Sequence, residues 1–83
     1  MDITKIISGL SSSQKTIVTI LAAHPEGLLS TELTQKTGIS NKASIVGSES
    51  FKKHLAENNL ELYLERRSKQ WLWVLRPISK NKE

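Results

Sequence analysis

The chain has no cysteine among its 83 residues, which excludes a disulfide framework and any zinc site built on thiolates. No apolar run approaches the ~20 residues of a membrane-spanning helix. The first ten residues lack a basic stretch followed by a long apolar stretch, so they are unlike a signal peptide. We therefore expect one small domain that does not enter a membrane and works in the cytoplasm.

Chemistry-bearing clusters are also scarce. The chain has two histidines, His24 and His54, and neither has a second ligand or a base at a suitable spacing. There is no glycine-rich phosphate loop and no close carboxylate pair suited to acid–base work. We expect no enzyme, no metal and no cofactor, and we interpret His24 as a helix-end residue.

The chain has more basic than acidic residues, and the excess positive charge is unevenly distributed. Residues 1–39 hold three basic and three acidic residues, whereas residues 40–83 hold nine basic and five acidic residues. The net charge of +4 therefore resides in the second half. A one-sided basic surface is what a polyanionic partner would select, although a mildly basic soluble protein gives the same total.

The first part of the chain reads as two helices. Apolar residues at helical spacing predict a short helix over residues 2–10. A serine cluster at residues 11–13 then provides an N-cap for an amphipathic helix of about three turns. Pro25 ends this helix, because the residue before proline disfavours the helical conformation.

A helical corner follows between residues 28 and 40. Ser30 is a plausible N-cap, and Glu32 adds negative charge at the positive end of the helix dipole. Gly38 follows the last turn, where a positive φ is needed, and Ser40 can cap the next helix. Such an order is typical of a helix-turn-helix, although similar corners recur in unrelated folds.

The next helix is predicted to begin at about residue 41 or 48 and to end at residue 58. Phe51 and Leu55 lie on its core-facing stripe. Its outer face would present Lys42, Lys52 and Lys53.

The apolar period then changes to two, which predicts a β-hairpin. We expect Glu65 to pair with Gln70, so that the leucines of the first strand and both tryptophans of the second share one buried face. The opposite face is unusually apolar for a solvent face; it consists of Tyr63, Leu72 and Val74. Residues 2–10 or another subunit could cover it.

With this order of helices, the TELTQKTGIS corner and a basic hairpin, the chain resembles the winged helix-turn-helix family over residues 11–77. The resemblance implies an α+β fold with three helices and a C-terminal two-stranded wing. Residues 1–10 would be a helical extension and residues 78–83 a flexible basic tail. The segment between Ser40 and Leu60 is longer than the family pattern and contains Gly47.

The resemblance also implies double-stranded DNA binding by a small transcriptional regulator, with the third helix in the major groove and the wing tip on phosphates or the minor groove. The corresponding positions are Ser40, Asn41, Lys42, Ser44, Ser48, Ser50, Lys52 and Lys53 in the helix and Arg66, Arg67, Ser68 and Lys69 in the wing.

A protein-interaction module is the alternative. The hairpin face of Tyr63, Leu72 and Val74, or the helix that carries Ile3, Ile6 and Ile7, would then bind a second copy or another protein. A further alternative stacks Trp71 and Trp73 on unpaired bases. Their shared leucine-facing side instead predicts that both are buried.

Overall fold

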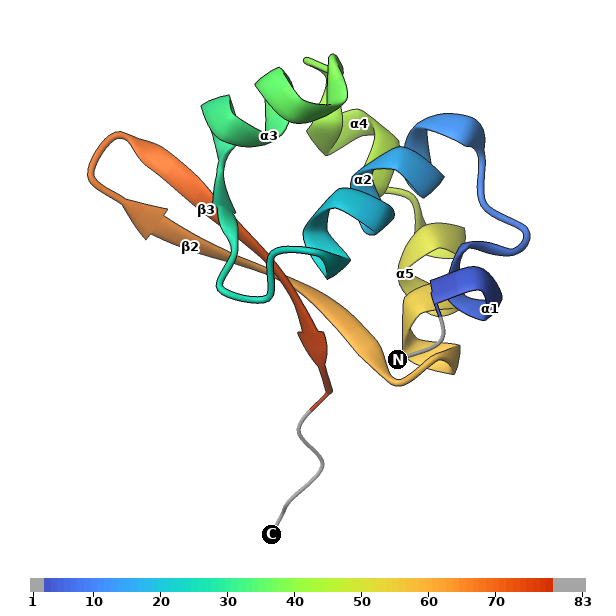
Figure 1. Ribbon diagram of the computed structural model, residues 1–83. Coiled ribbons are helices and arrows are strands. Elements are labelled where there is room, and N and C mark those ends of the chain that lie inside the picture. Colours follow the sequence, from blue (N-terminus) through green and yellow to red (C-terminus); the bar gives the residue numbers. More distant parts are fainter. Residues whose placement is uncertain (1–2, 79–83) are drawn as a thin grey trace, which may run out of the picture.

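The computed structural model describes residues 3–78. They form five helices and a three-stranded antiparallel sheet, with the helices packed beside the base of the sheet (Figure 1). In chain order the elements are α1 (Ile3–Ile7), α2 (Ser12–Ala22), β1 (Leu28–Leu29), α3 (Ser30–Thr37), α4 (Lys42–Val46), α5 (Glu49–Glu57), β2 (Leu60–Arg67) and β3 (Gln70–Pro77). No helix within the described residues is long and apolar enough to cross a membrane.

Residues 3–10 contribute to the core. Helix α1 is shorter than the predicted 2–10, yet Ile6 and Leu10 are buried and Ile3 and Ile7 pack against the same cluster. The ring of His54, on α5, donates from Nε2 to the carbonyl oxygen of Ile6. Burial of its apolar side and this bond hold α1 against the domain.

Helix α2 begins where the serine cluster predicted. The Ser11 hydroxyl accepts from the backbone N–H of Gln14 at 3.2 Å, and the Gln14 side chain accepts from the backbone N–H of Ser11 at 3.1 Å. These reciprocal bonds satisfy two donors that the first turn leaves free. The helix ends at Ala22, shortly before Pro25, as expected.

Helix α3 ends as predicted but begins differently. Gly38 follows it with φ of 73°, a conformation that favours glycine. Ser30 was predicted to be the N-cap, but it is the first helical residue. Instead, the Gln70 side-chain oxygen on β3 accepts from the backbone N–H of Thr31 at 3.2 Å and from its hydroxyl at 2.8 Å. The hairpin therefore caps the helix.

The predicted third helix is two helices, α4 and α5, separated by Gly47 and Ser48. Both candidate starts are used, because the Ser48 hydroxyl accepts from the backbone N–H of Phe51 at 3.3 Å and begins a new helix. Asn41, rather than Ser40, occupies the N-cap position of α4.

The strand order is β1-β3-β2, and the predicted hairpin register was wrong by two residues. Gln70 lies opposite Arg67, and Glu65 lies opposite Leu72. The reason is the turn: only Ser68 and Lys69 separate the strands, and Ser68 has a positive φ of 52°, which suits a two-residue turn. Because the error is an even number of residues, every side chain keeps its predicted face.

The two halves of the hairpin face differ in burial. Leu60, Trp73 and Leu75 are buried in the core, as predicted. Trp71 is 45% exposed and Leu64 is 41% exposed, so the expectation that both tryptophans are buried was wrong. The helices cover the base of the hairpin, and the turn end extends past α3 (Figure 1).

On the opposite face, cover comes from the turn before β1. Gly27 lies so close that a Cβ there would be 2.7 Å from Val74 Cγ2 and 3.2 Å from Leu72 Cγ. Tyr63 lies under the guanidinium of Arg76, 3.8 Å from its ring centroid. This face is therefore less open to a partner than the sequence suggested.

Candidate nucleic-acid interface

The turn end of the hairpin carries three exposed cations, which are Arg66 and Arg67 at the end of β2 and Lys69 in the turn. With Glu65 opposite Gln70, as predicted, the two arginines would lie in the loop of the hairpin, but they are strand residues. Neighbouring strand residues point to opposite faces, so the arginines lie on different sides of the sheet. Ser68, also predicted as a contact, is exposed in the turn.

The two arginines have different neighbours. The guanidinium of Arg66 lies over the Trp71 ring at 5.5 Å from its centroid, and its Nε donates to the Ser68 carbonyl oxygen at 3.2 Å. Arg67 forms an ion pair with Glu65. In the part of the chain that the structure describes, Arg66 and Lys69 have no acidic side chain within ion-pairing distance. Their charge is available to an anionic partner.

Lys42 is a correction to the predicted contacts. It is only 4% exposed, because its stem packs inside the α3–α4 corner. Its ammonium donates to the hydroxyl of Thr34 and lies 5.8 Å from the centroid of the Trp73 ring. A duplex on the surface does not reach this group, so Lys42 links α3, α4 and β3 instead of presenting charge.

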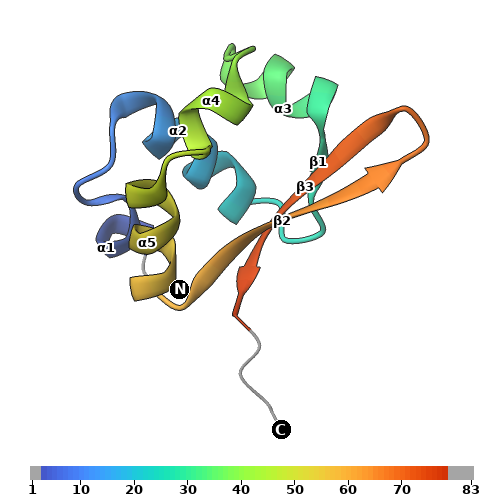
Figure 2. The ribbon, with the colours of Figure 1, turned by 180° about the vertical axis from the view of Figure 1, so that it is seen from behind.

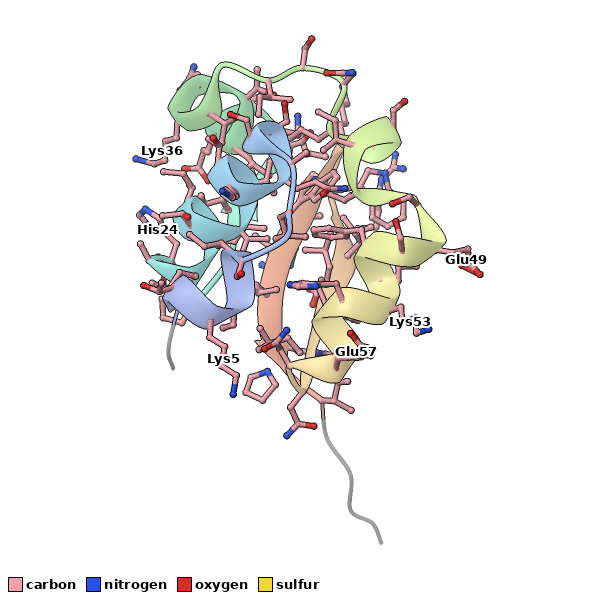
Figure 3. All side chains as sticks on the ribbon, turned by 90° about the vertical axis from the view of Figure 1, so that its right-hand side faces the viewer. Lys5, His24, Lys36, Glu49, Lys53 and Glu57 are labelled. Carbon is pink, nitrogen blue, oxygen red and sulfur yellow. The ribbon has the colours of Figure 1, made fainter. Side chains whose placement is uncertain are left out.

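The two lysines of α5 point in different directions. Lys53 projects from the same side of the helix as Glu49 and Glu57 (Figure 3), as expected for residues four apart. That side carries more negative than positive charge and is a poor phosphate surface. Lys52 lines a groove between α5 and the hairpin, on the sheet face that carries Arg66 and Trp71.

The other predicted helix contacts are exposed polar residues. Ser40, Asn41 and Ser44 lie before and within α4. Ser48 is engaged as the N-cap of α5, and its hydroxyl lies 3.4 Å from that of Ser50. Ser40, Asn41 and Ser44 at α4, together with the hairpin tip, therefore remain exposed and available for contact.

The structure gives the histidines structural partners. His54 donates to the carbonyl oxygen of Ile6, and His24 Nδ1 lies 3.5 Å from the Glu26 carboxylate. Among residues 3–78, no group of three or more histidine, aspartate or glutamate side chains is placed to hold a metal ion.

Sequence reasoning missed the groove beside Lys52. It has a volume of about 530 Å³ and a mostly apolar lining, with Leu64 and Trp71 on the hairpin side. The expected protein-binding surfaces lay elsewhere, on the opposite hairpin face and on α1, whose Ile6 is buried. In the observed register Arg66 lies opposite Trp71, and this pair of an arginine and a tryptophan could have indicated the hairpin side of the groove. The predicted register paired Trp71 with Leu64 instead and so hid this signal.

No protein-family model matches the chain, and no curated protein or solved structure matches it either. A proposal for the function therefore depends on the chemistry of the surface that the structure describes.

Proposed function

We propose that the chain binds double-stranded DNA as a small transcriptional regulator, with a winged-helix-like arrangement. The observation that carries the proposal is the cationic hairpin tip, formed by Arg66, Arg67 and Lys69, which extends past the helices (Figure 1). Exposed cations on a projecting hairpin suit contact with phosphates or with a narrow minor groove.

The arrangement of elements supports the same proposal. A helix that ends at Gly38 is followed by α4, and the later hairpin joins β1 in the order β1-β3-β2. These features agree with the family that the sequence resembles. Asn41 and Ser44, exposed at α4, are the polar side chains that would read base edges in the major groove.

Lys52 extends the positive surface, whereas the buried Lys42 and the acid-flanked Lys53 do not. In this proposal the backbone contacts come from the hairpin tip and Lys52. The predicted set of four helix and wing lysines is thus reduced to two, Lys52 and Lys69.

The test is a duplex-binding titration by fluorescence anisotropy at several salt concentrations, with the mass of the protein measured by size-exclusion light scattering. Replacing Arg66 and Arg67 together by alanine should weaken binding to every duplex. It should also lower the slope of log affinity against log salt by up to about two units, because two phosphate contacts are lost.

The matched control is Lys53→Ala, which removes a cation from the acidic side of α5 and should leave affinity and slope unchanged. Unchanged binding by the double arginine variant would count against the hairpin tip as the DNA contact. An equal loss in the control variant would indicate a general effect of net charge.

A further inference from the structure

The groove between the α4–α5 segment and the hairpin is an apolar feature that DNA binding does not explain. Its lining residues come mainly from α4, α5 and the hairpin, and Figure 2 shows how these elements are arranged. The hairpin side is lined by residues that include Leu64 and Trp71. The helical side combines the small Ala43, Gly47 and Ala56 with the larger Val46, Phe51, Lys52 and Leu55. Phosphates gain nothing from such a lining, whereas an exposed apolar surface marks a protein contact.

The dimensions of the groove suit a helix. Its lining follows β2 from Leu60 to Leu64, and at about 3.3 Å per residue this distance is about 13 Å. An α-helix rises 1.5 Å per residue, so apolar residues at i, i+4 and i+7 span about 10.5 Å. The small residues of the opposite wall leave room for a helix backbone, and about 530 Å³ accommodates several apolar side chains.

The charges beside the groove define its partner further. Lys52 lines the groove, and Arg66 lies over Trp71 at its hairpin wall. Glu61 also lines the groove, but its carboxylate accepts from Arg76 Nε at 2.7 Å and is already neutralised. Lys52 therefore lines the groove and Arg66 lies beside its hairpin wall, and an acidic partner complements both cations.

We propose that this groove binds an amphipathic α-helix of another protein, with three apolar anchors between acidic side chains that pair with Lys52 and Arg66. Trp71 and Leu64 bury their exposed area against the anchors. Aromatic and arginine side chains in such positions usually contribute most of the binding energy of an interface. The groove shares Lys52 and Arg66 with the proposed DNA contact, whereas Arg67 and Lys69 lie outside it, so a bound helix and a duplex would compete for these two cations.

The first experiment uses a fluorescein-labelled 15-residue peptide with leucines at i, i+4 and i+7, glutamates beside them and alanine elsewhere. Its control has lysine in place of every glutamate. Anisotropy titrations with the full chain should show binding of the glutamate peptide, at least about tenfold tighter than the lysine peptide. The double variant Leu64→Thr with Trp71→Ala should weaken binding at least about tenfold.

The second experiment exchanges charge across the interface. Lys52→Glu should weaken binding of the glutamate peptide and strengthen binding of the lysine peptide. Lys53→Glu has the same net charge but changes the acidic side of α5 (Figure 3), so both affinities should stay as in the unmodified chain. Circular dichroism melting establishes that each variant is folded.

Three results would overturn the proposal. In the first, neither peptide binds at protein concentrations up to about 1 mM. Another is the same response to Lys52→Glu and Lys53→Glu, which would reflect net charge alone. The last is a Leu64→Thr/Trp71→Ala variant that loses duplex affinity but keeps peptide affinity, since the groove would then be a nucleic-acid surface.

Discussion

The base and the turn end of one hairpin have similar residues but opposite environments. At the base, Trp73 is 6% exposed among core side chains, whereas Trp71, two residues earlier on the same face, is 45% exposed. The two strands are longer than the layer of helices that covers them (Figure 1). The part of the hairpin under the helices is therefore buried, and the part beyond them is exposed. The base stabilises the fold, and the turn end is available for binding.

The largest expected effect comes from the base. Trp73→Ala should lower the free energy of unfolding by about 3–5 kcal/mol, which would leave little stability in a domain this small. Trp71→Ala should cost less than about 1 kcal/mol, because nearly half of its surface is already in water. Urea titrations followed by circular dichroism measure both values.

Trp73→Phe gives a graded version of the same comparison. The Nε1 atom of Trp73 is buried and finds no hydrogen-bond partner within residues 3–78. Phenylalanine keeps most of the ring packing and removes this unsatisfied donor, so it should cost clearly less than alanine. Equal losses for Trp73→Ala and Trp71→Ala would remove the distinction between the two halves.

A smaller effect is expected where the hairpin meets the helices. Gln70→Ala removes the acceptor for two donors of Thr31 and should cost about 0.5–1 kcal/mol, comparable to the loss of an N-cap. The control is Gln35→Ala, at an exposed position of α3, the helix that contains Thr31. It should change the unfolding free energy by no more than a few tenths of a kcal/mol. A similar small change in both variants would show that the cap contributes nothing measurable.

A small net effect is expected at Lys42. Lys42→Met keeps the apolar stem that packs against Trp73 and removes a charge that is costly to bury. We expect the unfolding free energy to change by less than about 1 kcal/mol, with DNA affinity unaltered. A tenfold loss of DNA affinity without loss of stability would return Lys42 to the DNA contacts.

Local features of this fold were predictable, and features set by distant contacts were not. Ser11, Gly38 and the period-two leucines indicated a cap, a helix end and a strand, because each depends on neighbouring residues. The exposure of Trp71 depends on where the helices end in space. The burial of Lys42 depends on Thr34, which lies in another helix.

The candidate site shows the same division. The charged hairpin tip was visible in the sequence, since Arg66, Arg67 and Lys69 are close together along the chain. The groove was not, because its walls come from α4, α5 and the hairpin, and their approach is a tertiary event. The different surroundings of Lys52 and Lys53 could not be predicted without knowing where α5 packs.

The placement of the two tryptophans also equips the chain with a pair of intrinsic optical reporters. Indole emission shifts to the blue in apolar surroundings and to the red in water, so Trp73, enclosed in the core, and Trp71, open to solvent, should emit at different wavelengths. Single-tryptophan variants would separate the two signals. The emission of Trp73 would then report unfolding of the domain. The emission of Trp71 would report binding at the projecting end of the hairpin, without any added dye.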